Sequence, residues 1–495
     1  MTLNVESQRE AGPVGRSGFD ARFGMIVIVL LWSFMLNSLV GLMAGNAQAQ
    51  VAIHYHTTEI VWFTQISLLL GVFSTPFTIK AAGMFGKQRT LMAITALGFI
   101  GDLIAALSTN YPSLLIGRGL AGLYVPSSAL VYALTRDVFP RRLVGPVSGL
   151  FAGGTGLLAL GGPFLSGWLL GDYGFRGVLW FMAIASALAA LTLLLVPESP
   201  VREPRTRIDW LGGLLLGGGL TAVIYGVGNG SAWGWTSIGT LAYIIGGFAA
   251  VLAFLFAESR TAHPILPLSL LGRRRVWTMF LVTTLVVGGF YGQSIVLNLL
   301  ELMPSIPHLS AGLGWSATKA AWVGAPSSTL IATAAVATGT IVRRVDSRRL
   351  LGAGAVLTTA GLALLAEFHH SVPQLMFLPL ITALGIGICI ALVPVMIIES
   401  VSAEEQTKAD GAQNLIQGVG FAVLTQVAFV LVSQHDHVAQ GTAFYADGSY
   451  RTALWLFAAV AVVAALLSVL IPKVGRIGDA DAGAGPEEAA DALTV

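Results

Sequence analysis

Asp102 and Arg118 are ionisable residues that lie well inside long apolar stretches, where a charge is costly. The stretches 90–109 and 112–135 are joined by a very short turn. As helices crossing a membrane they would run antiparallel and place both side chains at matching depth. A charge at such depth costs about 2.5–3.5 kcal/mol, which makes it a functional candidate. We predict an ion pair whose acid changes its proton affinity when its partner moves. The alternative is that Asp102 faces a water-filled vestibule and backbone carbonyls satisfy Arg118.

The composition explains why these charges would lie in a membrane. Of 495 residues, 55% are hydrophobic and 11% are charged, whereas a soluble protein carries roughly 25% charged residues. Apolar runs of about 20 residues, each long enough to span a bilayer as a helix, recur along the chain. We predict an all-α polytopic membrane protein with fourteen spans, the first at 24–46. Cys389 is the single cysteine, which excludes an intramolecular disulfide.

Lysine and arginine are unevenly distributed between the predicted loops. With fourteen spans, both tails lie on the same side of the membrane, and that side holds 23 of the 27 basic residues, those of the tails included. The exceptions are Arg118, Arg176, Lys319 and Arg451. The positive-inside rule then places both termini in the cytoplasm, so the chain is expected to be a multi-pass protein of the cytoplasmic (inner) membrane.

Two loops indicate an internal repeat. "IKAAGMFGKQRTL" (79–91) and "GTIVRRVDSRRLL" (339–351) both place a basic cluster before a new helix, and they lie eight spans apart. A six-helix repeat with two inserted helices explains this offset. The expected parts are a tail 1–23, a bundle 24–197, a linker with inserted helices 198–258, a bundle 259–472 and a tail 473–495. The predicted gating-loop residues are Gly86, Lys87, Arg89, Arg343 and Arg344.

Two further motifs carry a family resemblance. "GLFAGGTGLLALGGPFLSGW" (149–168) resembles the fifth-helix antiporter signature of the major facilitator superfamily, with matches at Gly149, Gly162, Pro163 and Gly167. "GRGLAGLYVPSSALVYALTRDVFPRR" (117–142) resembles the fourth-helix signature with its embedded arginine. Together with "DYGFRGVLWF" (172–181) and "IDWLGGLLLGGGL" (208–220), they resemble the fourteen-helix drug–proton antiporter branch, so the expected fold is six plus two plus six helices.

The chain also departs from that family pattern. Ile79, Gly83 and Met84 stand where relatives usually carry Gly, Asp and Arg, so the gate contact of that Asp cannot be assumed here. Asn37 stands where many relatives carry an acid. In the fifth span, glycines would let a neighbouring backbone approach closely and Pro163 would bend the helix. This suits an interface that moves, although static packing also explains it.

Polar uncharged and aromatic residues are the candidates for a substrate cavity. An apolar, aromatic cavity with few charges favours a lipophilic solute over a sugar or an amino acid, although some of these side chains would simply face lipid. The candidate cavity residues are Trp32, Asn37, Gln65, Tyr291, Gln293, Asn298, Gln413, Asn414 and Gln417.

Most other sequence motifs with a known chemistry are absent from the chain. No nucleotide-binding loop or Rossmann fingerprint occurs, so we expect no cofactor, no nucleic-acid partner and no enzyme activity. His435, Asp436 and His437 suggest a metal or pH-sensing site, but polar residues of a wet loop explain them as well, and we expect no metal.

The function expected from the residues and the resemblance is proton-coupled export of lipophilic small molecules. The alternatives are export of an endogenous lipid or metabolite, an uptake symporter, or a membrane scaffold or sensor that has lost transport. A periplasmic adaptor is left open as a partner.

Overall fold

The computed structural model describes residues 21–201, 210–260, 268–342, 344–401, 406–439 and 441–472, and helices dominate them. The first helices are α1 (Ala21–Tyr55), α2 (Val61–Phe85), α3 (Lys87–Ala106), α4 (Tyr111–Ala121), η1 (Gly122–Tyr124), α5 (Ser127–Val138), α6 (Arg141–Asp172), α7 (Gly174–Thr192) and η2 (Leu193–Leu195). Next come α8 (Trp210–Trp233), α9 (Ile238–Glu258), α10 (Leu268–Leu271), α11 (Arg274–Leu302), α12 (Ala317–Ile341), α13 (Ser347–Glu367), α14 (Val372–Ser400), α15 (Gln406–Val432), η3 (Ser433–His435) and α16 (Asp447–Ser468). Two antiparallel hairpins pair β1 (Ser305–Ile306) with β2 (Ser310–Ala311), and β3 (Asp436–Ala439) with β4 (Thr442–Tyr445).

The predicted all-α membrane fold is confirmed. Thirteen helical segments of the described residues are long and apolar enough to cross a membrane, with α4, η1 and α5 together forming one of them. α15 supplies a fourteenth, although its apolar part, Ile416–Val432, is shorter. The prediction for the first span, 24–46, was too short at its C-terminal end. α1 continues to Tyr55 because Ala47, Val51 and Ala52 are buried and extend its packed face.

The fourth spanning segment is broken near its middle. α4 gives way to the 3₁₀ turn η1, and α5 begins only after Pro126. Proline has no backbone N–H to donate to the preceding turn, so an uninterrupted α-helix is disfavoured here. Gly122 packs directly on the backbone of Ser67 in α2, which a side chain at this position would prevent. Short 3₁₀ stretches within helices often mark functional hinges.

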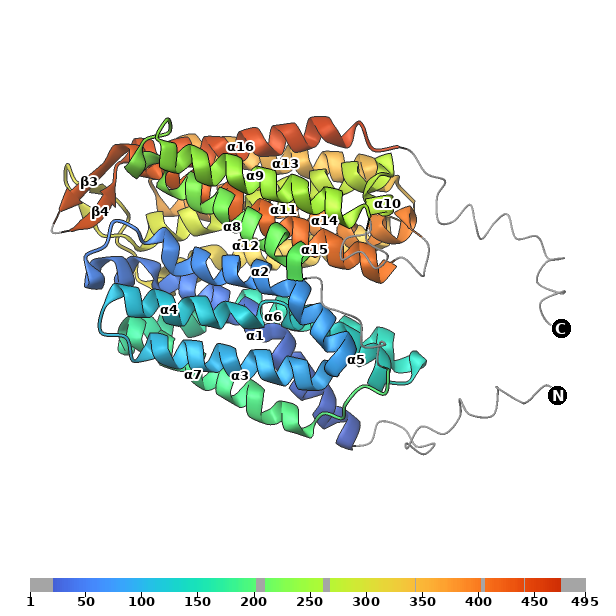
Figure 1. Cartoon of the computed structure of the whole chain (residues 1–495). Coiled ribbons are helices and arrows are strands. Elements are labelled where there is room, and N and C mark those ends of the chain that lie inside the picture. The colour runs from blue at the N-terminus through green and yellow to red at the C-terminus, as the bar shows by residue number, and fades with distance from the viewer. Residues whose placement is uncertain are drawn as a thin grey trace, which may run out of the picture.

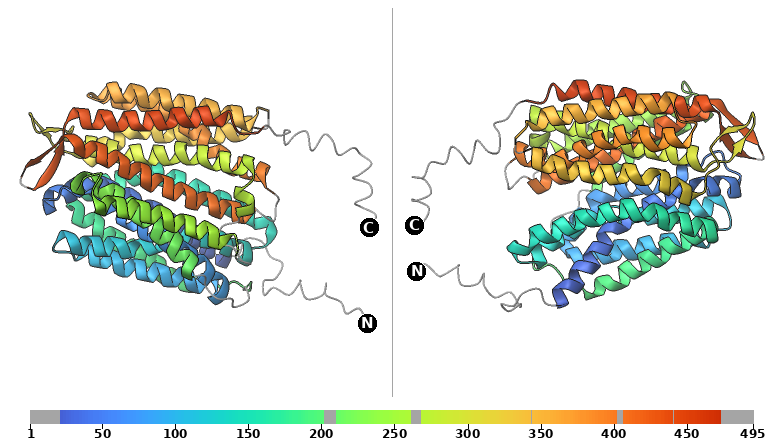
Figure 2. Two further views of the ribbon diagram at one scale, coloured as in Figure 1. Left: turned by 45° about the horizontal axis from the view of Figure 1, so that its top comes forward. Right: turned by 180° about the vertical axis from the view of Figure 1, so that it is seen from behind.

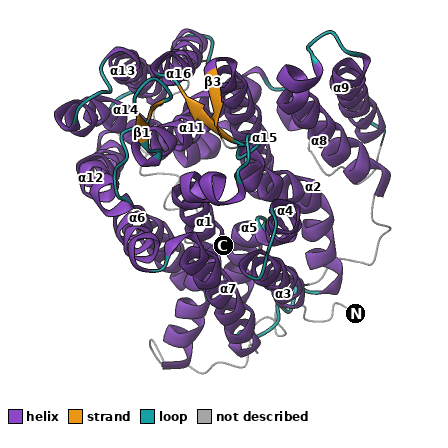
Figure 3. Ribbon diagram, turned by 90° about the vertical axis from the view of Figure 1, so that its left-hand side faces the viewer, coloured by secondary structure: helices purple, strands orange, loops and turns teal. Residues whose placement is uncertain are grey.

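The helices form two groups with the α8–α9 pair beside them (Figures 1 and 3). Helices α1–α7 make one group and α11–α16 the other. α8 packs on α2 and α15, at the seam between the groups. Both hairpins lie at the end of the molecule opposite the start of α1 and the end of α16 (Figure 1). We call these the hairpin end and the terminus end.

The hydrophobic cores show how the two groups are joined. One core cluster contains residues of both groups, among them Met43 and Phe63 with Leu299 and Phe457, and it lies toward the hairpin end. Toward the terminus end the cores are separate: one around Leu30 and Phe151 belongs to α1–α7, and another around Met279 and Met396 involves α8, α9 and α11–α16. Figure 2 shows the groups diverging in the same direction. The described residues therefore adopt a state that is closed at the hairpin end.

Candidate functional site

Asp102 and Arg118 meet between α3 and α4, as the sequence predicted for their positions. Arg118 Nη1 lies 3.5 Å from Asp102 Oδ1, and the two side chains are only 3% and 0% exposed. The Tyr124 hydroxyl donates to the other carboxylate oxygen, Asp102 Oδ2, at 3.1 Å. Both oxygens of a fully buried acid are thus engaged, one by a cation and one by a phenol. Removing either partner would leave part of a buried charge unsatisfied.

Glycines allow this pair to form. Gly101 and Gly117 directly precede the acid and the base in sequence, and their backbones touch across the α3–α4 interface. A Cβ at Gly117 would lie 2.5 Å from Ala105 N and 2.6 Å from Gly101 O. Helices in lipid associate through such close packing of small residues. The motifs "IGD" and "IGR" therefore bring together two backbones and the charged side chains that follow them.

Tyr124 is the part of the site that the sequence analysis did not predict. It lies in η1, where the break of the fourth segment changes the direction in which side chains point. Its ring packs directly over Gly98 of α3, at a place where no side chain would fit. The signal in the sequence is "GLYVP" (122–126), in which a glycine and a proline flank the tyrosine and indicate a helix break.

Arg118 also connects the acid to α2. Its Nε donates to the Phe63 carbonyl at 3.5 Å, and its guanidinium lies 5.4 Å from the centre of the Phe63 ring. Two residues further along α2, the buried Gln65 donates from Nε2 to the Ala422 carbonyl of α15 at 3.1 Å. Gln65 was predicted as a cavity residue, and it bridges the two helix groups in this state. A short, contiguous chain of contacts thus runs from Asp102 to the opposite group.

The fifth-helix motif lies in α6, and its glycines differ in their surroundings. Gly167 packs on the backbone of α12, where a Cβ would lie 2.7 Å from Thr318 N. Next to Pro163, Phe164 makes an edge contact with Trp322 of α12, with ring centres 5.0 Å apart. A Cβ at Gly162 would lie 3.2 Å from Leu42 Cδ1 of α1, whereas one at Gly149 would have no neighbour within 4 Å among the described residues.

This difference corrects one expectation from the sequence. A smooth face was expected along the fifth span. Gly154 does pack on α1, where a Cβ would lie 2.6 Å from Leu31 Cδ1, but at Gly149, Gly153 and Gly161 a Cβ would have no described neighbour within 4 Å. The close contacts of α6 with α12 described above, at Phe164 and Gly167, lie in the C-terminal half of α6.

The predicted gating loop is held by acids from distant parts of the chain. Gly86 has φ +114°, a conformation that favours glycine, and allows α3 to start directly after α2. Lys87 forms an ion pair with Asp137 at the end of α5. Glu198 accepts hydrogen bonds from the backbone N–H groups of Gln88 (3.0 Å) and Arg89 (3.1 Å). A carboxylate at a helix N-terminus is stabilising.

Glu198 and Asp137 thus supply acidic contacts in a loop that lacks the family's usual acid. The sequence analysis missed both, since they are more than 45 residues from the loop. In the equivalent loop of the second group, Arg344 is exposed and Asp346 caps α13 by accepting from Arg348 N at 3.0 Å. Arg343 lies outside the described residues.

Several predicted cavity residues of α11 and α15 have free hydrogen-bonding atoms. Gln413 Nε2 donates to Thr283 Oγ1 at 2.7 Å, but its Oε1 has no partner among the described residues. The same holds for Gln293 Oε1 and Gln417 Nε2. Tyr291 is half exposed, with its ring 6.1 Å from that of Phe421 in α15. Asn298 is partly buried in α11, and the Asn414 side chain lies outside the described residues.

The two predicted cavity residues of α1 have a different environment. Trp32 donates from its indole N–H to the Ala185 carbonyl of α7 at 3.1 Å, so it helps to fix α1 on α7. Asn37 is partly buried. Near them, Phe34 packs 5.1 Å from Tyr132 and 5.3 Å from Phe151, which forms an aromatic cluster between α1, α5 and α6.

Comparisons with known proteins agree with this architecture. The chain is 26% identical over 430 residues to the tetracenomycin C resistance and export protein of Streptomyces glaucescens, covering 81% of this chain and 76% of that protein. It is 28% identical over 304 residues to the uridine/deoxyuridine transporter of Lactococcus lactis, covering 58% and 61%. The alignment spans about half the length of an uncharacterized MFS-type transporter of Mycobacterium tuberculosis, at 27% identity over 354 residues and 70% of this chain.

A solved structure and a family profile identify the fold and the family. An auto inhibited POT family peptide transporter superposes with a TM-score of 0.64 at 15% identity, over 90% of this chain and 96% of that one. The profile of the Major Facilitator Superfamily matches residues 23–303 and 297–492. The chain is therefore a multi-pass protein of the cytoplasmic membrane and belongs to the Major Facilitator Superfamily of transporters.

Proposed function

We propose that this transporter exports lipophilic small molecules across the cytoplasmic membrane in exchange for protons. The observation that carries the proposal is the buried group of Asp102, Arg118 and Tyr124. An acid that is completely buried within a membrane helix, and is held by partners that can move, is a suitable proton carrier. The export direction is supported by the similarity to the tetracenomycin C resistance and export protein of Streptomyces glaucescens.

The proposed coupling starts with the charge on Asp102. While the acid is ionised, Arg118 and Tyr124 hold it, and Arg118 is drawn toward α3. A proton on the carboxylate removes the charge that Arg118 faces. The electrostatic attraction that holds Arg118 between α3 and α2, where it donates to the Phe63 carbonyl, is then lost. Gln65, which lies on α2 like Phe63, donates to the Ala422 carbonyl of α15. A shift of α2 would therefore loosen a contact that closes the hairpin end.

Alternating access is supported by the arrangement of the cores. The two helix groups share a core toward the hairpin end and have separate cores toward the terminus end. In the proposed cycle, the shared core separates and the terminus end closes. In this cycle the bundles 24–197 and 259–472 rock against each other. The part 198–258 is the linker with the inserted helices. Gly86, Lys87, Arg89, Arg343 and Arg344 would act as gating loops at the terminus end, which we place in the cytoplasm.

The proposed substrate site lies between the two groups. Amide atoms of Gln293, Gln413 and Gln417 without partners among the described residues can hydrogen-bond a solute. Tyr291 and the Phe34–Tyr132–Phe151 cluster offer aromatic surface. Aromatic walls with a few neutral polar groups favour a largely apolar ligand with some hydrogen-bonding atoms.

The proposal is tested with the purified full chain in proteoliposomes and a fluorescent lipophilic dye, Hoechst 33342, as probe. An imposed pH gradient should drive the dye toward the acidic side, and dye added without a gradient should move protons the opposite way. Nigericin, which collapses the pH gradient, should abolish accumulation. Transport that ignores the gradient would contradict proton coupling, and movement of dye and protons in the same direction would identify a symporter.

A further inference from the structure

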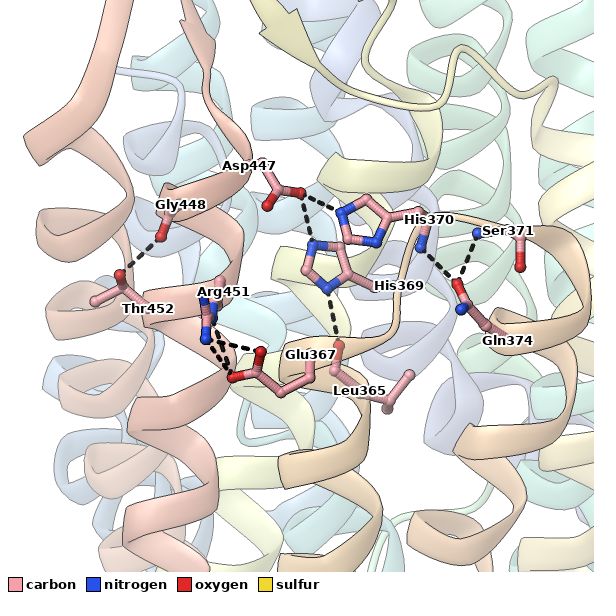
Figure 4. A network of polar contacts seen from close by, with 10 residues as sticks. All are labelled: Leu365, Glu367, His369, His370, Ser371, Gln374, Asp447, Gly448, Arg451 and Thr452. Atoms are coloured by element: carbon pink, nitrogen blue, oxygen red, sulfur yellow. Dashed lines mark hydrogen bonds and ion pairs between the residues drawn. The ribbon is translucent and has the colours of Figure 1, made fainter.

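His369, His370 and Asp447 form a compact cluster in the second helix group (Figure 4), whereas Asp102 and Arg118 belong to the first. The histidines lie in the turn between α13 and α14, and Asp447 is the first residue of α16. One ligand atom from each lies within 4.8 Å of the other two. Since His370 is 59% and Asp447 47% exposed, the cluster is open to solvent. Its residues are of the types that bind metal ions in proteins.

The hydrogen bonding of His369 determines which nitrogen is free. Its Nδ1 lies 2.9 Å from the Leu365 carbonyl, which can only accept, so Nδ1 carries the hydrogen. In a neutral ring, Nε2 then has a lone pair, and this atom faces Asp447 Oδ1 at 3.1 Å. A cation between Nε2 and Oδ1 would be bound by both atoms. A backbone carbonyl that accepts from the rear nitrogen of a histidine is also the usual support of a metal ligand.

His370 directs its ring to the same oxygen. Its Nε2 lies 2.7 Å from Asp447 Oδ1, and the two imidazole rings are stacked 4.5 Å apart with an angle of 22° between their planes. A single metal ion bound by both Nε2 atoms and the carboxylate satisfies all three groups with one positive centre.

The surroundings hold the ligands and do not compete for the ion. Glu367 is bound by Arg451 at 2.7 Å and by the Trp455 indole N–H at 2.8 Å, so the nearby acid and base neutralise each other. Gln374 Oε1 accepts from His370 N at 3.0 Å and from Ser371 N at 3.1 Å, which fixes the backbone of the turn. Asp447 lies in the first turn of α16, where a negative group is favourable.

We propose that His369, His370 and Asp447 bind a divalent transition-metal ion of the Zn²⁺ class. Two imidazole nitrogens and one carboxylate oxygen form an open three-ligand site, whose fourth position is left to water. In a tetrahedral Zn²⁺ site neighbouring ligand atoms are about 3.3 Å apart, close to the observed 2.7 and 3.1 Å from nitrogen to oxygen. The three ligand atoms lie within 4.8 Å of one another, so the exposed His370 and Asp447 side chains would rotate to bring the two nitrogens to the same spacing.

A bound ion would fasten the start of α16 to the α13–α14 turn. The preceding hairpin β3–β4 reaches α1 of the other group, where Thr442 Oγ1 donates to the Ala52 carbonyl at 3.4 Å. Metal binding would therefore restrain a contact that belongs to the closed hairpin end. Binding itself does not depend on the transported solute, so this proposal and the proposed transport function fail separately.

The test uses the full chain with a tag that contains no histidine, purified in detergent and stripped with EDTA. Competition with a fluorescent zinc chelator measures the Kd, and Co²⁺ is added as a spectroscopic probe. We expect one Zn²⁺ per chain, a visible Co²⁺ absorption band typical of low coordination number, and a higher melting temperature with Zn²⁺.

The deciding variants are His370→Ala and Asp447→Asn, because both side chains are exposed and their loss should not disturb folding. Each should raise the Kd for Zn²⁺ at least tenfold. His437→Ala is the matched control: it removes an exposed histidine of β3 at the same end and should leave the Kd unchanged. No saturable Zn²⁺ binding by the wild type, or an unchanged Kd in both variants, would overturn the proposal. A weaker Kd in His437→Ala alone would move the site to the 435–437 segment.

Discussion

Gly167→Ala should shift the balance between the two end states of the transporter. Gly167 packs on α12, and the added Cβ would lie 2.7 Å from Thr318 N and 2.8 Å from Thr318 Cα. These are backbone atoms, so no side chain can rotate away, and α6 and α12 must separate by roughly 0.7 Å to restore ordinary contact. Overpacking of this kind costs about 1–3 kcal/mol. The cost applies only where the two helices touch, so the closed hairpin end should lose roughly 5- to 150-fold in relative population.

The shift is measured by electron paramagnetic resonance between spin labels on Thr109→Cys and Thr452→Cys, exposed positions of the two groups toward the hairpin end, in a Cys389→Ser background. Gly167→Ala should increase the fraction of long distances. Gly153→Ala, in the same helix, is the control, because the added Cβ would have no neighbour within 4 Å in the part of the chain that the structure describes. If Gly167→Ala left the distance distribution unchanged, or if both variants shifted it equally, the argument about this contact would be wrong.

Three further predictions concern the ion pair, the loop and the topology. Arg118→Ala leaves Asp102 buried without its cation, at a cost of about 3–5 kcal/mol, so it should lower the melting temperature and transport more than Arg118→Lys, which keeps the charge but loses the planar fork. Equal effects of the two substitutions would exclude a role for the charge. Glu198→Ala should destabilise the fold by about 0.5–2 kcal/mol through the lost cap on α3, seen as a lower melting temperature. Arg89→Gln should change little because its ion pair is long and exposed. Reporter fusions after residues 204 and 274 should be cytoplasmic and one after residue 435 external; an external signal at 204 or 274 would refute the orientation of the termini.

The sequence was sufficient to predict the fold and one ion pair. Fourteen apolar stretches follow from the length of a helix that spans a bilayer. The meeting of Asp102 with Arg118 follows from equal depth on two helices joined by a short turn. Both inferences use only the spacing of residues along the chain, which can be read directly from the sequence. The glycines next to the two charged residues also carry the signal for close backbone contact.

Other parts of the site depend on contacts between distant segments. Tyr124 reaches Asp102 only because a 3₁₀ turn redirects it, and Glu198 reaches the α2–α3 loop from the end of the first group. The expected smooth glycine face of α6 is interrupted at Gly149, because which glycine meets a neighbouring helix depends on how distant helices pack. Asp447 meets His369 and His370 across 77 residues or more. Spacing along one helix contains none of this information.

The central claim is that Asp102 carries the proton that drives transport, and Asp102→Asn tests it most directly. The asparagine is nearly equal in size and cannot be ionised. The control is Glu301→Gln, which removes an acid near the end of α11 instead. In proteoliposomes, Asp102→Asn should still exchange Hoechst 33342 down its own gradient but should not concentrate it with an imposed pH gradient, while Glu301→Gln should do both. Accumulation by Asp102→Asn at the wild-type level would contradict the account, and its loss in Glu301→Gln alone would assign the proton to Glu301.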